Sequence, residues 1–168
     1  MDRRTMLAAF GGAGIGVGMG AGESLAAIAG ERTPQEIAEA FARSLSAHDI
    51  DAFAELYGDD MINHQQSAAA PAPPQGMSAR QSAVAFFGAR LKGLPDLTVA
   101  IEALVATDDY CAASFVYSGT HQGTYLGVPP TGKSLRFTSC DIFRIAQGRI
   151  AEHWGMGDIA GQSAQLKG

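Results

Sequence analysis

The chain has 168 residues and a mass of 17.4 kDa, a length typical of one domain with room for a tail. Apolar residues make up 46% of the chain and charged residues 17%, which excludes a polar disordered protein. The net charge of −5 and the absence of a run of Lys and Arg argue against a nucleic-acid or anionic-membrane partner.

The first 29 residues have the pattern of an export signal. Arg3 and Arg4 precede an uncharged, glycine-rich stretch, and Ala27-Ile28-Ala29 has the small-x-small pattern of a signal-peptidase site. Paired arginines at this place are typical of the twin-arginine type. The apolar stretch is too short to predict a membrane span. We expect residues 1–29 to be removed on export, which leaves residues 30–168; an uncleaved tail on a cytoplasmic protein is the alternative.

Three helices are predicted in the first half of residues 30–168. The first and the third begin with a capping box, in which a hydroxyl and a Glu or Gln three residues later satisfy free N–H groups. Apolar residues then recur at helical spacing, and Asp49 can cap a shorter helix between these two. The expected helices cover residues 33–47, 49–57 and 78–93, and an Ala- and Pro-rich loop covers 66–76.

After Pro95 the pattern changes to alternating apolar and polar residues, which is typical of strands. A turn at Asp108-Asp109 and a two-residue turn at Gln147-Gly148 connect neighbouring strands. Helices followed by an antiparallel meander predict an α+β fold, with the helices packed on one face of the sheet. The expected strands cover residues 97–101, 110–121, 135–145 and 150–156, after a brief extended piece at 61–64.

Alternation places one carboxylate on the apolar side of the strand at residues 135–145. With a regular two-residue hairpin, Asp141 lies opposite Trp154 and Phe143 lies opposite Glu152, whereas His153 faces solvent. A one-residue bulge would break this register. The apolar residues that share the side of Asp141 are Leu135, Phe137, Phe143 and Ile145.

Burial of this carboxylate predicts chemistry, because an apolar environment penalises its charged form and suits it to act as a general acid or base. The alternative is a structural carboxyl that a hydroxyl or an amide satisfies. His121 ends the preceding strand and is expected within reach of the same cavity; a surface or capping position is its alternative. Glu152 is a second candidate acid, with an ion pair to Arg149 or Arg136 as the alternative. The residues expected to line the cavity are Asn63, His64, Tyr125, Phe137, Phe143, Glu152 and Trp154.

The cysteines and histidines predict neither a disulfide nor a metal site. In the expected register Cys140 faces Phe115 rather than Cys111, so we expect two free, buried thiols. The four histidines, at positions 48, 64, 121 and 153, show none of the HxH, HxxxH or HxxE spacings that place metal ligands on one element. We therefore expect no bound metal.

Several segments resemble the SnoaL-like polyketide cyclases and ester cyclases. The resemblance is carried by Gly119–Lys133, by Asp141–Arg144, by Gly148–Trp154 and by Asp158 with the closing Gln165-Leu166. It covers nearly all of residues 30–168. It implies a nuclear-transport-factor-2-like cone, in which a curved, mostly antiparallel sheet wraps around three helices and encloses a deep apolar pocket.

The resemblance also implies a reaction. In such cyclases an aspartate and a histidine act without metal or cofactor, which points to Asp141 as the acid/base group and His121 as its partner. The implied step removes a proton α to a carbonyl of a small hydrophobic or aromatic ester, and the carbanion then closes a ring by aldol addition. The resemblance suggests a homodimer as well, through the less polar outward residues Thr138, Cys140 and Ile142. A non-catalytic, exported small-molecule-binding protein of the same fold is the alternative.

Overall fold

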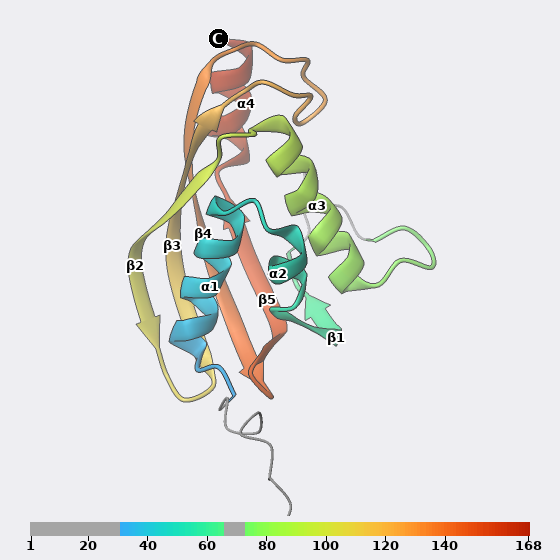
Figure 1. Ribbon diagram of the computed structural model, residues 1–168, viewed down its shortest axis with the longest axis vertical. Coiled ribbons are helices and arrows are strands. Elements are labelled where there is room, and N and C mark those ends of the chain that lie inside the picture. The colour runs from blue at the N-terminus through green and yellow to red at the C-terminus, as the bar shows by residue number, and fades with distance from the viewer. Residues whose placement is uncertain (1–30, 66–72) are drawn as a thin grey trace, which may run out of the picture. The chain divides into compact units, whose positions relative to one another are not determined.

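A computed structural model describes residues 31–65 and 73–168, which form a helical layer against a curved sheet (Figure 1). The predicted signal peptide over residues 1–29 lies outside the described residues, as does most of the predicted loop at 66–76. The elements are α1 (Pro34–Ser46), α2 (Ile50–Ala54), β1 (Tyr57–Asn63), α3 (Ala79–Gly93), β2 (Thr98–Ala106), β3 (Tyr110–Thr120), β4 (Ser134–Ala146), β5 (Arg149–Gly157) and α4 (Ile159–Lys167).

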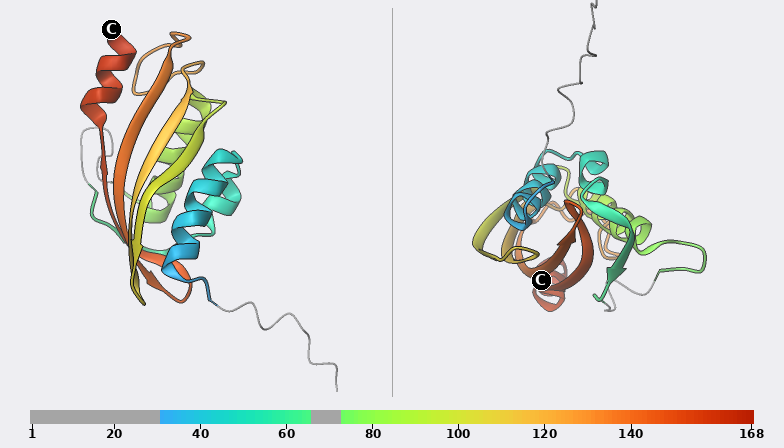
Figure 2. Two further views of the ribbon diagram at one scale, coloured as in Figure 1. Left: turned by 90° about the vertical axis from the view of Figure 1, so that its left-hand side faces the viewer. Right: turned by 90° about the horizontal axis from the view of Figure 1, so that it is seen from below.

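The sheet has the order β1-β5-β4-β3-β2, in which β1 runs parallel to β5 and every other pair is antiparallel. Helices α1, α2 and α3 lie on one side of this curved sheet, as the views in Figures 1 and 2 agree. We call the sheet face toward these helices the inner face and the opposite face the outer face. The α+β fold with a mostly antiparallel sheet is therefore confirmed. None of the helices within the described ranges is long and apolar enough to cross a membrane.

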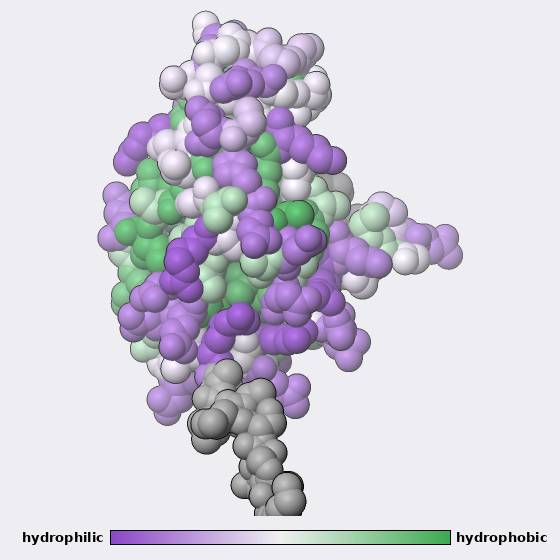
Figure 3. Space-filling view, in the orientation of Figure 1, coloured by the Kyte–Doolittle hydropathy of each residue, from purple (hydrophilic) through white to green (hydrophobic). Residues whose placement is uncertain are grey.

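Both predicted capping boxes are present. The Thr33 hydroxyl accepts the Glu36 N–H at 3.3 Å, and the Glu36 carboxylate accepts the Thr33 N–H at 2.8 Å. Ser78 and Gln81 repeat this exchange at the start of α3. A satisfied first turn stabilises the start of each helix. Helix α1 is amphipathic and buries Ile37, Phe41 and Leu45, and α3 buries Phe87 and Leu91. Figure 3 shows the result from the helix side, where hydrophilic side chains lie over the helices and hydrophobic ones show between them.

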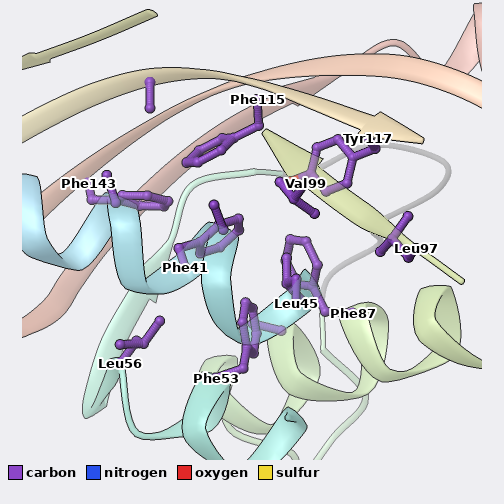
Figure 4. Close-up of a cluster of buried hydrophobic side chains, with 14 of the residues drawn as sticks. Phe41, Leu45, Phe53, Leu56, Phe87, Leu97, Val99, Phe115, Tyr117 and Phe143 are labelled. Atoms are coloured by element: carbon purple, nitrogen blue, oxygen red, sulfur yellow. The ribbon is translucent and has the colours of Figure 1, made fainter. Parts of the chain in front are cut away.

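The core between the helices and the inner face is built around Phe41 of α1 (Figure 4). Its ring centroid lies 4.9–5.3 Å from those of Phe53, Phe87, Phe115 and Phe143, which come from two helices and two strands. Edge and tilted contacts of this kind add to the free energy gained by burying the rings. One aromatic cluster thus holds the helices against the sheet.

Two elements of the structure differ from the sequence-based prediction. The second helix ends at Ala54 rather than at Tyr57, because Tyr57 begins β1 and pairs with Ile150 of β5. Helix α4 was not predicted from its composition. It buries only Gln162 and Leu166, so its sequence lacks an apolar stripe of ordinary width.

The predicted register between the last two strands is wrong by one residue. Gln147 and Gly148 both have positive φ and form the expected two-residue turn, with Ala146 paired to Arg149. One step further a β-bulge leaves Ala151 as an extra residue in β5, so that Arg144 pairs with Glu152.

The bulge has a packing cause. It allows both Ile150 and His153, which strict alternation would place on opposite faces, to lie buried on the inner face. Beyond it, Asp141 pairs with Gly155 instead of Trp154, and Phe143 pairs with His153 instead of Glu152.

The cysteine prediction is half confirmed. Both thiols are free, and Cys111 is buried on the inner face. Cys140, however, is exposed, because it lies on the outer face between Ser114 and Met156 of the neighbouring strands.

Truncation of the central ring tests this description of the core. Phe41→Ala should lower the free energy of unfolding by about 3–5 kcal/mol, because it removes a fully buried ring and leaves a cavity. Met156→Ala, at a side chain that is 79% exposed, is the control and should stay within about 0.5 kcal/mol of the parent. Urea unfolding measures both values. A loss below about 1 kcal/mol for Phe41→Ala would contradict the central position of this ring.

Candidate functional site

A buried pair of ionisable side chains lies on the inner face at the centre of the sheet. The imidazole Nε2 of His153 lies 2.8 Å from Oδ1 of Asp141, and the two side chains are 2% and 5% exposed. The Ser139 hydroxyl donates to Oδ2 of the same carboxylate at 2.5 Å. A carboxylate buried this deeply needs such donors, since an unpaired buried charge is costly. The bulge in β5 is what brings His153 to this position.

Two phenols complete what we call the inner polar cluster, which consists of Asp141, His153, Ser139, Tyr117 and Tyr57. The Tyr117 hydroxyl lies 3.5 Å from Oγ of Ser139. The Tyr57 hydroxyl is buried and has no hydrogen-bond partner among the described residues. Burial, and after it the charge of Asp141, raises the pKa of Tyr57 well above its ordinary value, and the same two causes raise that of Tyr117. Both phenols therefore stay protonated and can act as hydrogen-bond donors.

The surroundings of the cluster are apolar. The ring centroid of His153 lies 4.9 Å from that of Phe143 and 6.2 Å from that of Tyr57. Nδ1 of His153 is buried and has no partner in the described parts of the chain. Hydrogen bonds gain strength in such a low-dielectric environment, and polar atoms left unpaired there are costly. The unpaired Tyr57 and His153 atoms are thus places where a bound polar molecule would find partners.

The lack of a side chain at Gly155 leaves room for the carboxylate of Asp141. A Cβ atom at this position would lie 2.6 Å from Oδ1 of Asp141 and 2.6 Å from Oε1 of Gln65. Both distances are shorter than real Cβ contacts, so only glycine lets these two polar groups approach the strand so closely. Gln65 directly follows β1, which places it beside the cluster.

His121 is not brought to Asp141 by the structure. Ala113 pairs with Asp141, and His121 lies eight residues further along the chain, a path of about 26 Å at roughly 3.3 Å per residue in an extended strand. Its Nδ1 accepts the Thr131 N–H at 3.2 Å and lies 2.9 Å from the Thr131 hydroxyl, while Nε2 is buried without a described partner. The place beside Asp141 that was expected for His121 is taken by His153.

Trp154, Glu152 and His64 lie on the outer face, away from Asp141. The rings of Trp154 and His64 stack with centroids 4.3 Å apart and an interplanar angle of 4°. Glu152 accepts hydrogen bonds from His64 at 2.7 Å and from Arg144 at 2.5 Å. These two partners, His64 first, lower the pKa of Glu152. Glu152 is therefore ion-paired, as one interpretation of the sequence held, but with Arg144, since the bulge sets these two residues opposite each other.

The other residues expected to line the cavity lie in three places: the inner face, the loop between β3 and β4, and the end of β1. Phe143 and Phe137 lie on the inner face, and Phe137 stacks on Tyr117 with centroids 5.0 Å apart. Tyr125 is buried in the loop between β3 and β4. Asn63 ends β1 beside His153, and its side-chain oxygen accepts the N–H of Gln65 at 3.0 Å.

A hollow of about 690 Å³ lies on the outer face, and two of its lining residues, Gly155 and Gln65, adjoin Asp141 of the inner polar cluster. It includes the stacked pair of Trp154 and His64 and the exposed side chains of Ile142 and Met156. This is the face through which the sequence analysis expects a homodimer to form, and that homodimer stays a prediction. The residues that line the hollow are His64, Gln65, Tyr110, Cys140, Ile142, Trp154, Gly155 and Met156.

Asp141 could be predicted from the sequence, but its hydrogen-bonding partners were not predicted. Ser139 and Tyr117 could have been found, because alternation places them on the same inner face as Asp141 and Phe115. His153 could not, since its position depends on the bulge. Within residues 31–65 and 73–168, no three His, Cys, Asp or Glu side chains are grouped so that they could hold a metal ion.

Comparison with known proteins agrees with this architecture. The family model of SnoaL-like polyketide cyclases matches residues 35–166. A search of curated proteins finds no match. The crystal structure of wild-type IdmH, a proposed polyketide cyclase from Streptomyces antibioticus, is 30% identical and superimposes with a TM-score of 0.68, over 79% of this chain and 97% of that one.

Two further solved structures share the fold at lower identity. TsrD from Streptomyces laurentii is 23% identical, with a TM-score of 0.67 over 79% of this chain and 93% of its own. AclR from Streptomyces galilaeus, a proposed hydroxylase, is 20% identical, with a TM-score of 0.66 over 79% of this chain and 80% of its own. The helices, the curved sheet and the family match lead to one conclusion: the chain belongs to the SnoaL-like polyketide cyclase family, with its nuclear-transport-factor-2-like fold.

Proposed function

We propose that this protein catalyses the acid/base ring closure of a small carbonyl substrate, with Asp141 as the base. The observation that carries the proposal is the buried carboxylate of Asp141, held by His153 and Ser139 near the Tyr57 hydroxyl, which has no hydrogen-bond partner in the described parts of the chain. Membership of a cyclase family supports the same reaction class.

The proposed step moves one proton and forms one carbon–carbon bond. Asp141 takes a proton from the carbon α to a carbonyl group, and the Tyr57 hydroxyl donates a hydrogen bond to the oxygen on which charge develops. The carbanion adds to a second carbonyl carbon of the same molecule, and the resulting alkoxide takes the proton back. His153 and Ser139 act as positioning residues, since each donates to one oxygen of the carboxylate and fixes its direction.

A second candidate function is small-molecule binding without catalysis. The observation that favours it is that both oxygens of Asp141 already have partners within the protein. In that case the carboxylate would be structural, and its neutral replacement would cost stability rather than turnover.

Replacement of the carboxylate separates the two candidates. Asp141→Asn keeps the size of the side chain but cannot take up the proton, so kcat/KM should fall at least about 10²-fold while the midpoint of thermal unfolding stays within a few degrees. A suitable probe is an acetoacetate methyl ester whose terminal carbon carries an ortho-formylphenyl group. It closes to a hydroxynaphthoate ester with loss of one water, and the product is followed by fluorescence.

Asp108→Asn, in the exposed turn between β2 and β3, is the matched control and should leave turnover and stability unchanged. Unchanged turnover in Asp141→Asn would remove Asp141 from the mechanism. A large loss of stability with no measurable turnover in the parent would favour the binding protein.

Tyr57→Phe tests the proposed donor. The folded protein holds the pKa of Tyr57 above its unfolded value near 10, so ionisation of this phenol leaves the free energy of unfolding unchanged below about pH 10 and lowers it as pH rises further. Above about pH 10 the free energy of unfolding of Tyr57→Phe should therefore fall less steeply with pH than that of the parent, by up to about 1.4 kcal/mol per pH unit. At pH 7 its stability should equal or exceed that of the parent, because the lost hydroxyl had no partner.

Turnover in Tyr57→Phe should fall by roughly 10²-fold, the scale expected for loss of one donor to a developing oxyanion. Tyr110→Phe, on a ring that is 38% exposed, is the control for both readouts. Urea unfolding between pH 8 and 11 and the ring-closure assay measure the two effects. Full turnover in Tyr57→Phe would exclude this phenol as the donor.

We also propose that the chain is exported by the twin-arginine route, on the evidence of Arg3, Arg4 and Ala27-Ile28-Ala29. Replacing both arginines by lysine should retain the protein in the cytoplasm. The mass of the N-terminal peptide from fractionated cells measures this, and an intact Met1 found only in the cytoplasm of the parent strain would contradict it.

A further inference from the structure

Arg90 of α3 is a buried cation on the inner-face side of the molecule. Arg90 is only 4% exposed, and no carboxylate of the described residues forms an ion pair with it. Burial of an unpaired charge is costly, so its retention needs a reason. Its Cζ atom lies 4.7–5.2 Å from the centroids of four aromatic rings, those of Phe86, Phe87, Tyr117 and Phe137.

The guanidinium stays charged in this environment. Burial acts to lower the pKa of Arg90, but Tyr125, Tyr117 and Asp141 together outweigh it and the pKa is raised. The four aromatic rings compensate through their negative faces, and each such contact is worth about 2 kcal/mol when desolvated. Together they can offset much of the several kcal/mol that burial of one ion costs, but they accept no hydrogen bond from the Nη groups in the plane of the guanidinium.

A chain of hydrogen bonds fixes the direction of this side chain. Nε of Arg90 donates to the Tyr125 hydroxyl at 3.1 Å, which donates to Oε1 of Gln162 at 2.6 Å. The amide of Gln162 donates in turn to the backbone oxygen of Asp158 at 3.1 Å. Tyr125 is packed so closely on Gly93 that a Cβ there would lie 2.6 Å from the Cβ atom of Tyr125 and 3.1 Å from its ring. Only Nε is used by this chain, and both Nη groups are without a hydrogen-bond partner among the described residues.

Arg90 is connected to the inner polar cluster through Tyr117. The guanidinium lies over the Tyr117 ring at 4.7 Å, and the hydroxyl of the same ring lies 3.5 Å from Ser139, which donates to Asp141. The Tyr117 ring and Ser139 thus connect the fixed cation to the Asp141 carboxylate on the inner face of β3 and β4.

We infer that Arg90 binds a carboxylate of the substrate, which is thus an anionic acid on an aromatic or similarly flat apolar frame. The two free Nη groups form the planar pair of donors that matches a carboxylate, and the surrounding rings fit a flat frame. The inference rests on the proposed function only in placing the reacting carbonyl group of the substrate at Asp141. Anion binding by Arg90 does not depend on the proposed function.

The competing explanation is that Arg90 only packs between the rings. The two explanations predict opposite effects of Arg90→Met, which keeps the length of the side chain and removes the charge. If the cation is held for a ligand, the ligand-free variant should unfold at the same temperature as the parent or higher, because a buried unpaired charge has been removed. If the cation holds the rings together, the variant should unfold at a lower temperature.

Binding of a hydroxynaphthoic acid and of its methyl ester tests the inference directly. The parent should bind the acid at least about 10-fold more tightly than the ester, measured by quenching of naphthol fluorescence at pH 7.5 in low salt. Arg90→Met should lose this preference, while its affinity for the ester stays within about threefold. Arg43→Met, at a side chain that is 68% exposed, is the matched control and should keep the preference.

Tyr125→Phe is the second variant and keeps the charge. It frees Nε and loosens the guanidinium, so the preference for the acid should weaken but remain. This variant decides the question if Arg90→Met does not fold. Equal binding of acid and ester by the parent, or no binding of the acid at millimolar concentration, would overturn the inference, and so would a full acid preference in Arg90→Met.

Asp141→Asn distinguishes a failure of this inference from a failure of the proposed function. The acid preference should persist in Asp141→Asn, because binding at Arg90 needs no proton transfer. If Asp141→Asn keeps full turnover while the acid preference depends on Arg90, the base is wrong and the anion site stands.

Discussion

The hydrogen bond between His153 and Asp141 is the interaction on which the arrangement of the inner face depends. A carboxylate in the aromatic interior is tolerated only if donors reach both of its oxygens. Ser139 provides one donor from the same strand, and the other must come from β5. Strict alternation in β5 would turn His153 outward, and the extra residue Ala151 turns it inward.

The same bulge sorts the charges of β4 and β5 between the two faces. On the outer face it sets Glu152 against Arg144, and His64 completes a partly exposed ion pair beside Trp154. On the inner face these two strands contribute one carboxylate and one imidazole, and the glycine at position 155 leaves room for Asp141. A local change of one residue thus determines which ionisable groups lie beside the aromatic core.

The inner face holds charges of both signs at separate places. Asp141 lies near the middle of β4, whereas Arg90 reaches the rings of Tyr117 and Phe137 from α3. Each group is fixed by hydrogen-bonding partners of its own rather than by the other. Such preorganised groups of opposite sign are suited to a substrate with an acidic carbon and an anionic end.

Much of the fold could be predicted from sequence because its signals are local. Capping boxes located α1 and α3, and alternation in β4 placed Asp141 on the apolar side with Phe137 and Phe143. The positions that failed depend on contacts between segments distant along the chain. The bulge at Ala151 follows from burial of Ile150 and His153 against other elements, and α4 is held by single contacts such as that of Gln162 with Tyr125.

For His121 the face of the sheet could be predicted from the sequence, but the distance from Asp141 could not. Its place on the inner side of β3 was correctly expected, and it is fully buried. Its distance from Asp141 was not, because proximity across a sheet depends on the pairing of β3 with β4 and not on the side that a residue faces. The cation at Arg90 gave no sequence signal, since an Arg in the last turn of a helix is most often exposed.

Nitrogen-15 NMR of the histidine rings tests the central claim most directly. The account predicts that His153 carries a hydrogen on Nε2 that exchanges slowly with water and resonates downfield, as expected for a buried bond to a carboxylate. The signal is assigned by its absence in His153→Gln, and it should shift strongly in Asp141→Asn. A His153 ring protonated on Nδ1 alone, or one whose nitrogen-bound hydrogen exchanges freely, would show that the pair does not form and would contradict the account.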